Sequence, residues 1–214
     1  MNIARIALVL KTGGEYTVKH AQVLARQIRD QLPFHEIICL SDVIVPGVHT
    51  ILLQHGWPGW WSKMEVCRPD IDGDLLYFDL DTVIISNIDA LAEVNRLTLL
   101  RDFYRNGVFQ ARPEGLGSGV MFLPEADRAV AWERWIEAPA EHMQMFKRGG
   151  DQAFLETLWL GTADRWQDVL PRQLVSYKMH VRGKSIPPEA RCIVFHGRPR
   201  PWAVYEFQHL YRAA

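Results

Sequence analysis

Two carboxylates spaced one residue apart, Asp79 and Asp81, are the side chains in this sequence best suited to chemistry. They follow the apolar run 75–78, which is typical of a strand buried on both faces of a mostly parallel sheet. Residues two apart in an extended chain point to the same side, so we expect both acids to face one spot. At about 4 Å and an effective dielectric of about 20, two such charges interact by roughly 4 kcal/mol, so the pair requires a cation. Because hard divalent ions prefer oxygen ligands, the sequence predicts a metal site at the end of a central strand.

The same Asp-x-Asp spacing occurs twice more, from Asp70 to Asp72 and from Asp72 to Asp74. This stretch contains proline and glycine, so we predict a solvated turn there. A calcium loop from Asp70 to Asp81 is excluded, because its sixth position is Leu75 and not glycine, and its twelfth is not glutamate. Only the pair after the apolar run has a strand in front of it.

Length and composition indicate one globular unit. The 214 residues are 48% hydrophobic, enough for one substantial core, so we predict a single domain spanning residues 1–214. A formal net charge of −1 gives no drive toward nucleic acid. Three scattered cysteines without a C-x-x-C pair favour free thiols in a reducing cytosol. The N-terminal apolar run is too short for a signal peptide or membrane span, so we expect a cytoplasmic protein with no transmembrane segment.

The strands and helices that must position the two acids are predicted to form an α/β layer. A strand at residues 3–10, a helix at 16–32 and a second strand at 35–40 open the chain. The turn at Gly13 and Gly14 lies at the carboxyl end of the first strand, where a ligand is expected, although it is not a G-x-G-x-x-G fingerprint. Further strands are expected at 97–100, within 115–124, at 174–179 and at 192–195, and further helices at 88–94, 125–138, 141–146 and 149–160.

Three tryptophans and a lysine precede the acid pair. Trp57, Trp60 and Trp61 are read first as core and lid packing, and an aromatic wall for a sugar is the alternative. Lys63 opens a short helical segment and could reach a phosphate, although a lone lysine is usually solvated.

Two later residues have both a structural and a chemical interpretation. Asp151 stands at the start of a predicted helix, where it either caps the helix or takes part in catalysis, and both roles stay open. His196 follows a predicted strand and precedes Gly197; in the company of an acid pair, we favour a metal ligand over a structural histidine.

These motifs, taken in order, resemble the nucleotide-sugar glycosyltransferases of the GT-A type, closest to glycosyltransferase family 8, the glycogenin and lipopolysaccharide galactosyltransferase group. The matching features are the strand-turn-Tyr16 opening, Lys63, Leu-Tyr-Phe-Asp79-Leu-Asp81, Ser118-Gly-Val-Met followed by Asp151-Gln152, and the ending His196-Gly with Arg-Pro-Trp. The resemblance implies an α/β, single-domain GT-A fold, which is a Rossmann-like nucleotide-diphospho-sugar transferase fold with a central mostly parallel sheet flanked by helices.

The resemblance also implies roles for individual residues. Asp79, Asp81 and His196 would bind manganese, or alternatively magnesium, that holds the donor diphosphate. The remaining donor contacts would come from Thr12 and Tyr16 at the base, Lys63 and Arg200 at phosphate, Ser118 at the donor, and Asp151 and Gln152 beside the donor sugar as catalytic residues. The chain departs from the family pattern at Gly13 and Gly14, at Gly117, and in the spacing of four residues from His196 to Arg200.

The function implied is transfer of a sugar from a nucleoside diphosphate sugar, most simply a UDP sugar, to a carbohydrate, lipid-linked or protein acceptor. A bound divalent ion would stabilise the charge that builds up on the departing diphosphate, and nearby Lys or Arg would add to this. Two other classes use similar residues: a nucleotidyltransferase or nucleotide-sugar hydrolase, and a non-catalytic nucleotide-sugar-binding protein.

Overall fold

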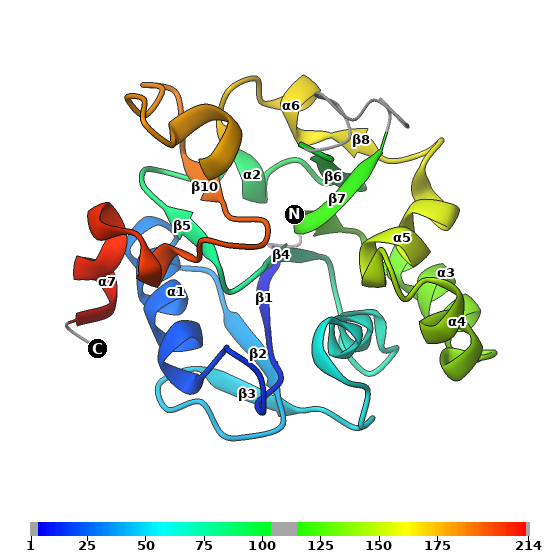
Figure 1. The fold of residues 1–214 in the computed structure, drawn as a ribbon. Coiled ribbons are helices and arrows are strands. Elements are labelled where there is room, and N and C mark those ends of the chain that lie inside the picture. Colours follow the sequence, from blue (N-terminus) through cyan, green and yellow to red (C-terminus); the bar gives the residue numbers. More distant parts are fainter. Residues whose placement is uncertain (1–3, 104–114, 213–214) are drawn as a thin grey trace.

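The first predicted strand, β1 (Arg5–Leu10), lies near the middle of the main sheet (Figure 1). The computed structural model describes residues 4–103 and 115–212, and these residues form a seven-stranded sheet in the order β3-β2-β1-β4-β7-β6-β8. The other strands of this sheet are β2 (Ile37–Ser41), β3 (His49–Leu52), β4 (Leu75–Phe78), β6 (Thr98–Arg101), β7 (Leu116–Leu123) and β8 (Asp164–Arg165).

All strands of this sheet except β7 run in one direction. β1 pairs in parallel with β2 and β4, and β2 with β3, whereas β7 is antiparallel to both β4 and β6. The carboxyl ends of β1, β2, β4 and β6 therefore meet at one edge of the sheet, which is where ligands bind in open α/β folds. The predicted α/β class with a mostly parallel central sheet is confirmed.

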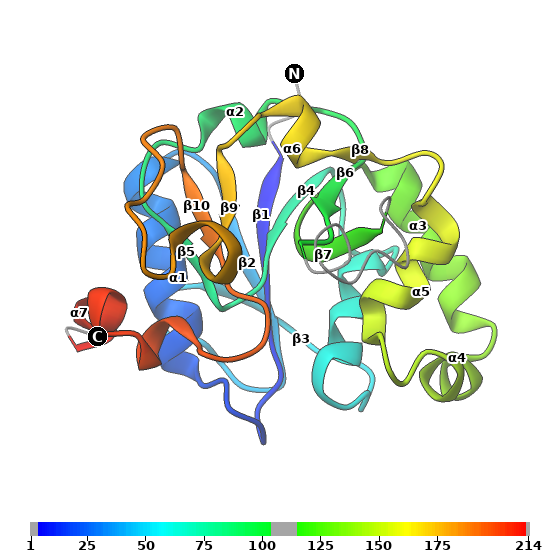
Figure 2. The same cartoon turned by 45° about the horizontal axis from the view of Figure 1, so that its top comes forward.

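Helices cover the sheet. In chain order they are α1 (Val18–Gln31), α2 (Asp89–Ala92), α3 (Glu125–Ile136), α4 (Pro139–Met145), α5 (Gly150–Trp159), α6 (Trp166–Val169) and α7 (Gln208–Arg212). Three segments are 3₁₀ helices, η1 (Gly59–Cys67), η3 (Pro201–Ala203) and η4 (Tyr205–Phe207), and η2 (Tyr177–Val181) is a π-helical turn. Figure 2 shows α1 and α7 to one side of β1, and α3, α4 and α5 to the other.

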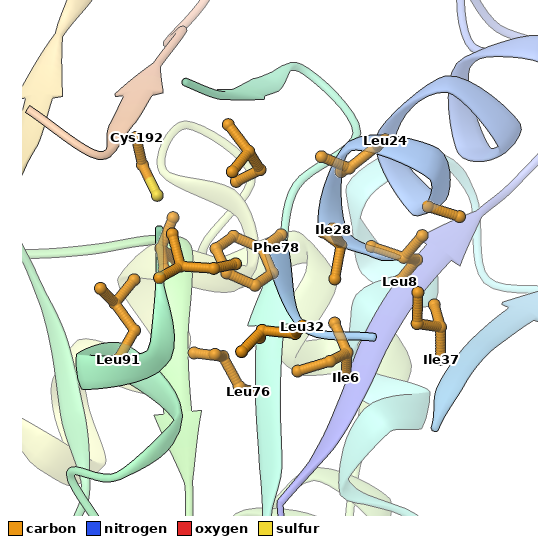
Figure 3. Close-up of a cluster of buried hydrophobic side chains, with 14 of the residues drawn as sticks. Ile6, Leu8, Leu24, Ile28, Leu32, Ile37, Leu76, Phe78, Leu91 and Cys192 are labelled. Atoms are coloured by element: carbon orange, nitrogen blue, oxygen red, sulfur yellow. The ribbon is translucent and has the colours of Figure 1, made fainter. Parts of the chain in front are cut away.

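Two apolar clusters fix the sheet between its helices. On one face, Ile6 and Leu8 of β1 pack with Leu24 and Ile28 of α1 and with Phe78 of β4 (Figure 3). On the other face, alternate residues of the same strands, such as Ala7 and Tyr77, pack with η1, α3 and α5. Each large side chain buried in this way contributes about 1.5–3 kcal/mol to stability. Burial on both faces explains why the run 75–78 is apolar throughout.

A second, three-stranded sheet lies beside the first, in the order β5-β10-β9. It is made of β5 (Thr82–Ile84), β10 (Cys192–Val194) and β9 (Leu174–Ser176). β10 pairs antiparallel with β5 and parallel with β9, with Val194 opposite Thr82. The late strands expected at 174–179 and 192–195 are therefore present, but the first is shorter because η2 begins at Tyr177.

Most predicted elements agree with the structure to within two or three residues at their ends. β3, β5 and β8 were not predicted from the sequence, because they are short or lie directly beside another apolar run. All three cysteines are buried free thiols, as expected. Among the described residues, no helix is both long and apolar enough to cross a membrane.

Candidate active site

A pocket of about 820 Å³ opens at the carboxyl edge of the main sheet. Its wall includes every residue that the sequence predicted for the site: Thr12, Tyr16, Lys63, Asp79, Asp81, Ser118, Asp151, Gln152, His196 and Arg200. The structure therefore brings these residues together in one pocket wall. Their individual roles stay predictions.

The acid pair lies in a turn, contrary to the extended chain expected from the sequence. The N–H of Thr82 donates to the carbonyl of Asp79 at 2.9 Å, which closes the turn Asp79-Leu-Asp81-Thr82. The N–H of Asp79 still donates to Gly119 of β7 at 2.8 Å. The reason for the turn is topological, because the chain leaves the main sheet after β4 and enters the second sheet as β5.

Lys63 links Asp79 to Asp151 inside the pocket wall. Its ammonium Nζ lies 2.8 Å from Asp79 Oδ1 and 3.0 Å from Asp151 Oδ2. Ser118 Oγ donates to the same Asp151 oxygen at 2.7 Å, and Tyr77 OH donates to Asp79 Oδ1 at 2.6 Å. Lys63 is only 6% exposed, so it is not solvated in the way that a lone lysine usually is. Burial tends to lower its pKa, but the two carboxylates outweigh this and raise it.

Asp151 does not cap its helix. The N-cap residue of α5 is Gly149, with no side-chain cap hydrogen bond, and Asp151 lies in the first turn with its carboxylate on Lys63 and Ser118. Of the two roles left open by the sequence, the capping role is wrong. Gln152 points its amide at Asp102, 2.8 Å from Oδ2, so both predicted catalytic residues are held by partners from other elements.

A second cation, Arg200, reaches Asp81 from the C-terminal part of the chain. Its guanidinium contacts Asp81 Oδ2 and donates to Glu15 Oε1. It also lies 5.2 Å from the ring centroid of Tyr16. Burial and the charge of Asp79 nevertheless raise the pKa of Asp81 to about 7, because they outweigh the attraction of Arg200.

His196 enters the same pocket from the end of β10. Its Nε2 lies 2.5 Å from Ser176 Oγ, and its ring stacks on Phe103 at 5.7 Å. Burial, followed by the charge of Lys178, lowers its pKa to about 4. The imidazole is therefore neutral near pH 7, which is the form that binds metals.

The donor set that the sequence predicts for a metal fits a divalent ion chemically but is not assembled in this arrangement. Two carboxylates and one imidazole lining one pocket are suitable ligands for manganese. Each carboxylate instead holds a cationic side chain, Asp79 with Lys63 and Asp81 with Arg200. Among the described residues, no three His, Cys, Asp or Glu side chains gather closely enough to hold a metal ion.

Several residues that line or support the pocket were not predicted from the sequence. Glu15 holds Arg200, and Asp102 holds Gln152. Asp42 accepts hydrogen bonds from Thr12 N–H at 2.9 Å and Thr12 Oγ1 at 2.8 Å. Asp42 and Asp102 follow β2 and β6 as Asp79 follows β4, so the rule that ligands gather at the carboxyl ends of parallel strands would have found them. Glu15 carries no such signal.

The chain has the fold of several solved glycosyltransferases. It superposes on the glycosyltransferase GlyE of Streptococcus pneumoniae TIGR4 with a TM-score of 0.70 and 14% identity, covering 98% of this chain and 61% of GlyE. On the galactosyltransferase LgtC, solved in complex with donor and acceptor sugar analogs, it gives a TM-score of 0.70 and 14% identity over 98% of this chain and 95% of LgtC. For the bifunctional glycosyltransferase WbbM the TM-score is 0.59 at 11% identity, over 98% of this chain and 49% of WbbM.

At these identities the similarity concerns the fold, and it confirms the GT-A architecture that the sequence motifs implied. No protein-family model matches the sequence, and no curated protein matches it.

Proposed function

We propose that this protein is a glycosyltransferase that moves a sugar from a nucleoside diphosphate sugar, with UDP as the nucleotide, to a carbohydrate acceptor. The observation that carries the proposal is the joining of Asp79, Lys63 and Asp151 in one pocket at the carboxyl edge of the sheet. The fold shared with LgtC, which has been solved with donor and acceptor sugar analogs, supports the same reaction class.

The pocket wall supplies positive charge where a leaving diphosphate needs it. As the bond between sugar and phosphate breaks, negative charge builds up on the departing nucleoside diphosphate. Lys63 and Arg200 are cations held at the pocket by carboxylates, so positive charge is already present where that negative charge develops. We assign both residues to the diphosphate.

We further propose manganese, or alternatively magnesium, as the ion at this site, held by Asp79, Asp81 and His196. When bound, such an ion acts as a Lewis acid on the diphosphate. Since Arg200 contacts Asp81 in the structure, this residue must leave that carboxylate for the ion to bind there.

Asp151 and Gln152 are assigned to the donor sugar. Ser118 and Lys63 both contact Asp151 Oδ2, so the carboxylate is fixed in the wall and kept beside a positive charge. Such a group orients the sugar hydroxyls and stabilises positive charge on the sugar ring as the leaving group departs. Thr12 and Tyr16 both line the pocket, with Tyr16 beside Arg200, and they are assigned to the base.

The decisive experiment is a thermal-shift screen of UDP, GDP and ADP sugars, with manganese or with a chelator, followed by product analysis with a mixture of carbohydrate acceptors. We expect one UDP sugar to raise the melting temperature most, since specific binding stabilises the folded state by mass action. Formation of a new glycoside supports transfer. Release of free sugar or sugar phosphate indicates a hydrolase, donor binding without any product indicates a binding protein, and no binding by any nucleotide sugar contradicts the proposal.

A further inference from the structure

Trp60 differs from the other tryptophans of the chain in being exposed. It is 57% exposed and lines the pocket, whereas the neighbouring Trp57 and Trp61 are buried against α3. Of the two interpretations of this segment, core packing therefore applies to some of its tryptophans, and an aromatic wall to another. Trp57 and Trp61 form core, and Trp60 presents an aromatic surface at the mouth of the pocket.

The indole ring of Trp60 packs against Gly150, the first residue of α5. A Cβ built on Gly150 would lie 2.8 Å from Trp60 Nε1, 2.9 Å from Cδ1 and 3.1 Å from Cε2. Nearly equal distances to three atoms of the five-membered ring mean that Gly150 lies over the ring face and not at its edge. Gly150 also has φ +65°, so both its backbone conformation and its contact with the indole require glycine. One face of the indole is thus packed, and the exposed fraction belongs to the rest of the ring.

This position is next to the residues assigned to the reaction. Trp60 and Lys63 are three residues apart in the 3₁₀ segment η1, where such residues lie above one another on one face. Gly150, against which the indole packs, directly precedes Asp151. The indole is therefore fixed next to the ion pair of Lys63 and Asp151, on its solvent side.

We propose that Trp60 is the stacking platform for the acceptor sugar, which the site takes as a hexopyranose with its apolar C–H face on the indole. The proposal rests on the glycosyltransferase function above. Indole combines a large apolar face with negative charge on that face, so it attracts the polarised C–H groups of a sugar ring. The donor sugar is assigned beside the buried Asp151, so a ring lying on the exposed Trp60 belongs to the second substrate.

The test separates acceptor binding from donor chemistry. Methyl glucosides, methyl galactosides, methyl N-acetylglucosaminides and lactose are screened by saturation-transfer NMR against the wild type and Trp60→Ala. We expect at least one sugar to bind the wild type and to lose about 10-fold or more in affinity in Trp60→Ala, while Trp60→Phe keeps most of it. Phe34→Ala is the matched control, because Phe34 is 91% exposed and lies outside the pocket wall.

Gly150→Ala provides a second variant that keeps the indole but displaces it. It should lower sugar affinity as Trp60→Ala does, with its melting temperature recorded to confirm folding. If no sugar binds the wild type, or if binding survives both variants, the stacking proposal is wrong. Release of nucleoside diphosphate from nucleotide sugars is measured on the same wild-type preparation, and its absence counts against the glycosyltransferase proposal and not against the platform.

Discussion

Lys63 Nζ lies 3.0 Å from Asp151 Oδ2, and both side chains are almost fully buried. Because Lys63 also contacts Asp79, one ammonium group joins the acid turn after β4 to the first turn of α5. The donor diphosphate is assigned to the acid turn and the donor sugar to the first turn of α5. A change in charge at either carboxylate therefore acts on the other through Lys63.

Lys63→Met should destabilise the protein strongly. Methionine keeps an unbranched apolar stem but lacks the ammonium group, so two carboxylates lose their buried cation, and breaking such a pair costs about 3–5 kcal/mol. Denaturant unfolding at pH 7 measures the change. Lys147→Met, on an exposed lysine, should change stability little. Adding Asp151→Asn to Lys63→Met should restore part of the loss, and a fully additive double variant would contradict the ion-pair account.

Asp151→Asn should leave the protein folded and lower turnover by at least about 100-fold. The amide keeps the shape and a hydrogen bond to Ser118 but removes the negative charge assigned to the sugar. Initial rates with the best donor measure this. Asp127→Asn is the control, since Asp127 is also an acid in the first turn of a helix, α3, but lies outside the pocket wall. Turnover close to wild type in Asp151→Asn would remove this residue from the reaction.

Asp79→Asn and Asp81→Asn should each abolish the manganese-dependent part of donor binding. A ligand at about 100 times its Kd stabilises the folded state by about 2.7 kcal/mol, so the loss is readily seen as a smaller thermal shift. Asp72→Asn serves as the control, because Asp72 belongs to both of the other Asp-x-Asp patterns and does not line the pocket. An undiminished manganese effect in both pocket variants would contradict the proposed metal site.

His20 should make α1 sensitive to acid. The N–H of the N-cap residue Thr17 donates to His20 Nδ1 at 2.9 Å, which requires that nitrogen to be unprotonated. Burial lowers the pKa of His20, and although Glu15 opposes this, Lys19 adds to it. A histidine with a lowered folded-state pKa contributes stability above its unfolded pKa of about 6.5, and this is lost as the pH falls below that value.

The matched variant for this prediction is His20→Gln, because glutamine at this position keeps a capping box and does not titrate. From pH 7.5 to pH 5, the wild type should lose unfolding free energy relative to His20→Gln, because only the wild type carries His20, whose folded-state pKa is lowered. Parallel pH profiles of the two proteins would show that the hydrogen bond from Thr17 contributes nothing.

The position of the acid pair could be predicted from the sequence, because a strand buried on both faces leaves an uninterrupted apolar run. The run 75–78 is apolar at every position, which only a strand covered on both faces requires, and Asp79 directly follows it. The turn at Asp79 was not predictable in the same way, because Asp-Leu-Asp-Thr contains neither glycine nor proline and Thr82–Ile84 is as strand-like as the run before it. The break between the two sheets is set by the pairing of β5 with β10, which no local pattern shows.

The sequence also could not predict which side chains from distant elements contact one another. That Lys63 is buried, and that Trp60 is exposed while Trp61 is not, depends on how η1 lies against β7 and α5. Apolar periodicity describes which face of an element is covered, but not which polar groups of distant elements meet. Asp151 is drawn away from the cap position by its contacts with Ser118 and Lys63, which the sequence of its own helix does not show.

The pairing of β10 with β5 has a consequence for the order in which the protein is built. Thr82, the residue after the second acid, finds its sheet partner only at Val194, and the loop that follows β10 carries His196 and Arg200. On the ribosome, the acids emerge long before these partners are synthesised. The main sheet around β1 and β4 forms from earlier segments, whereas the pocket closes only when β10 has docked, so the nascent chain completes its main sheet before it acquires a complete site.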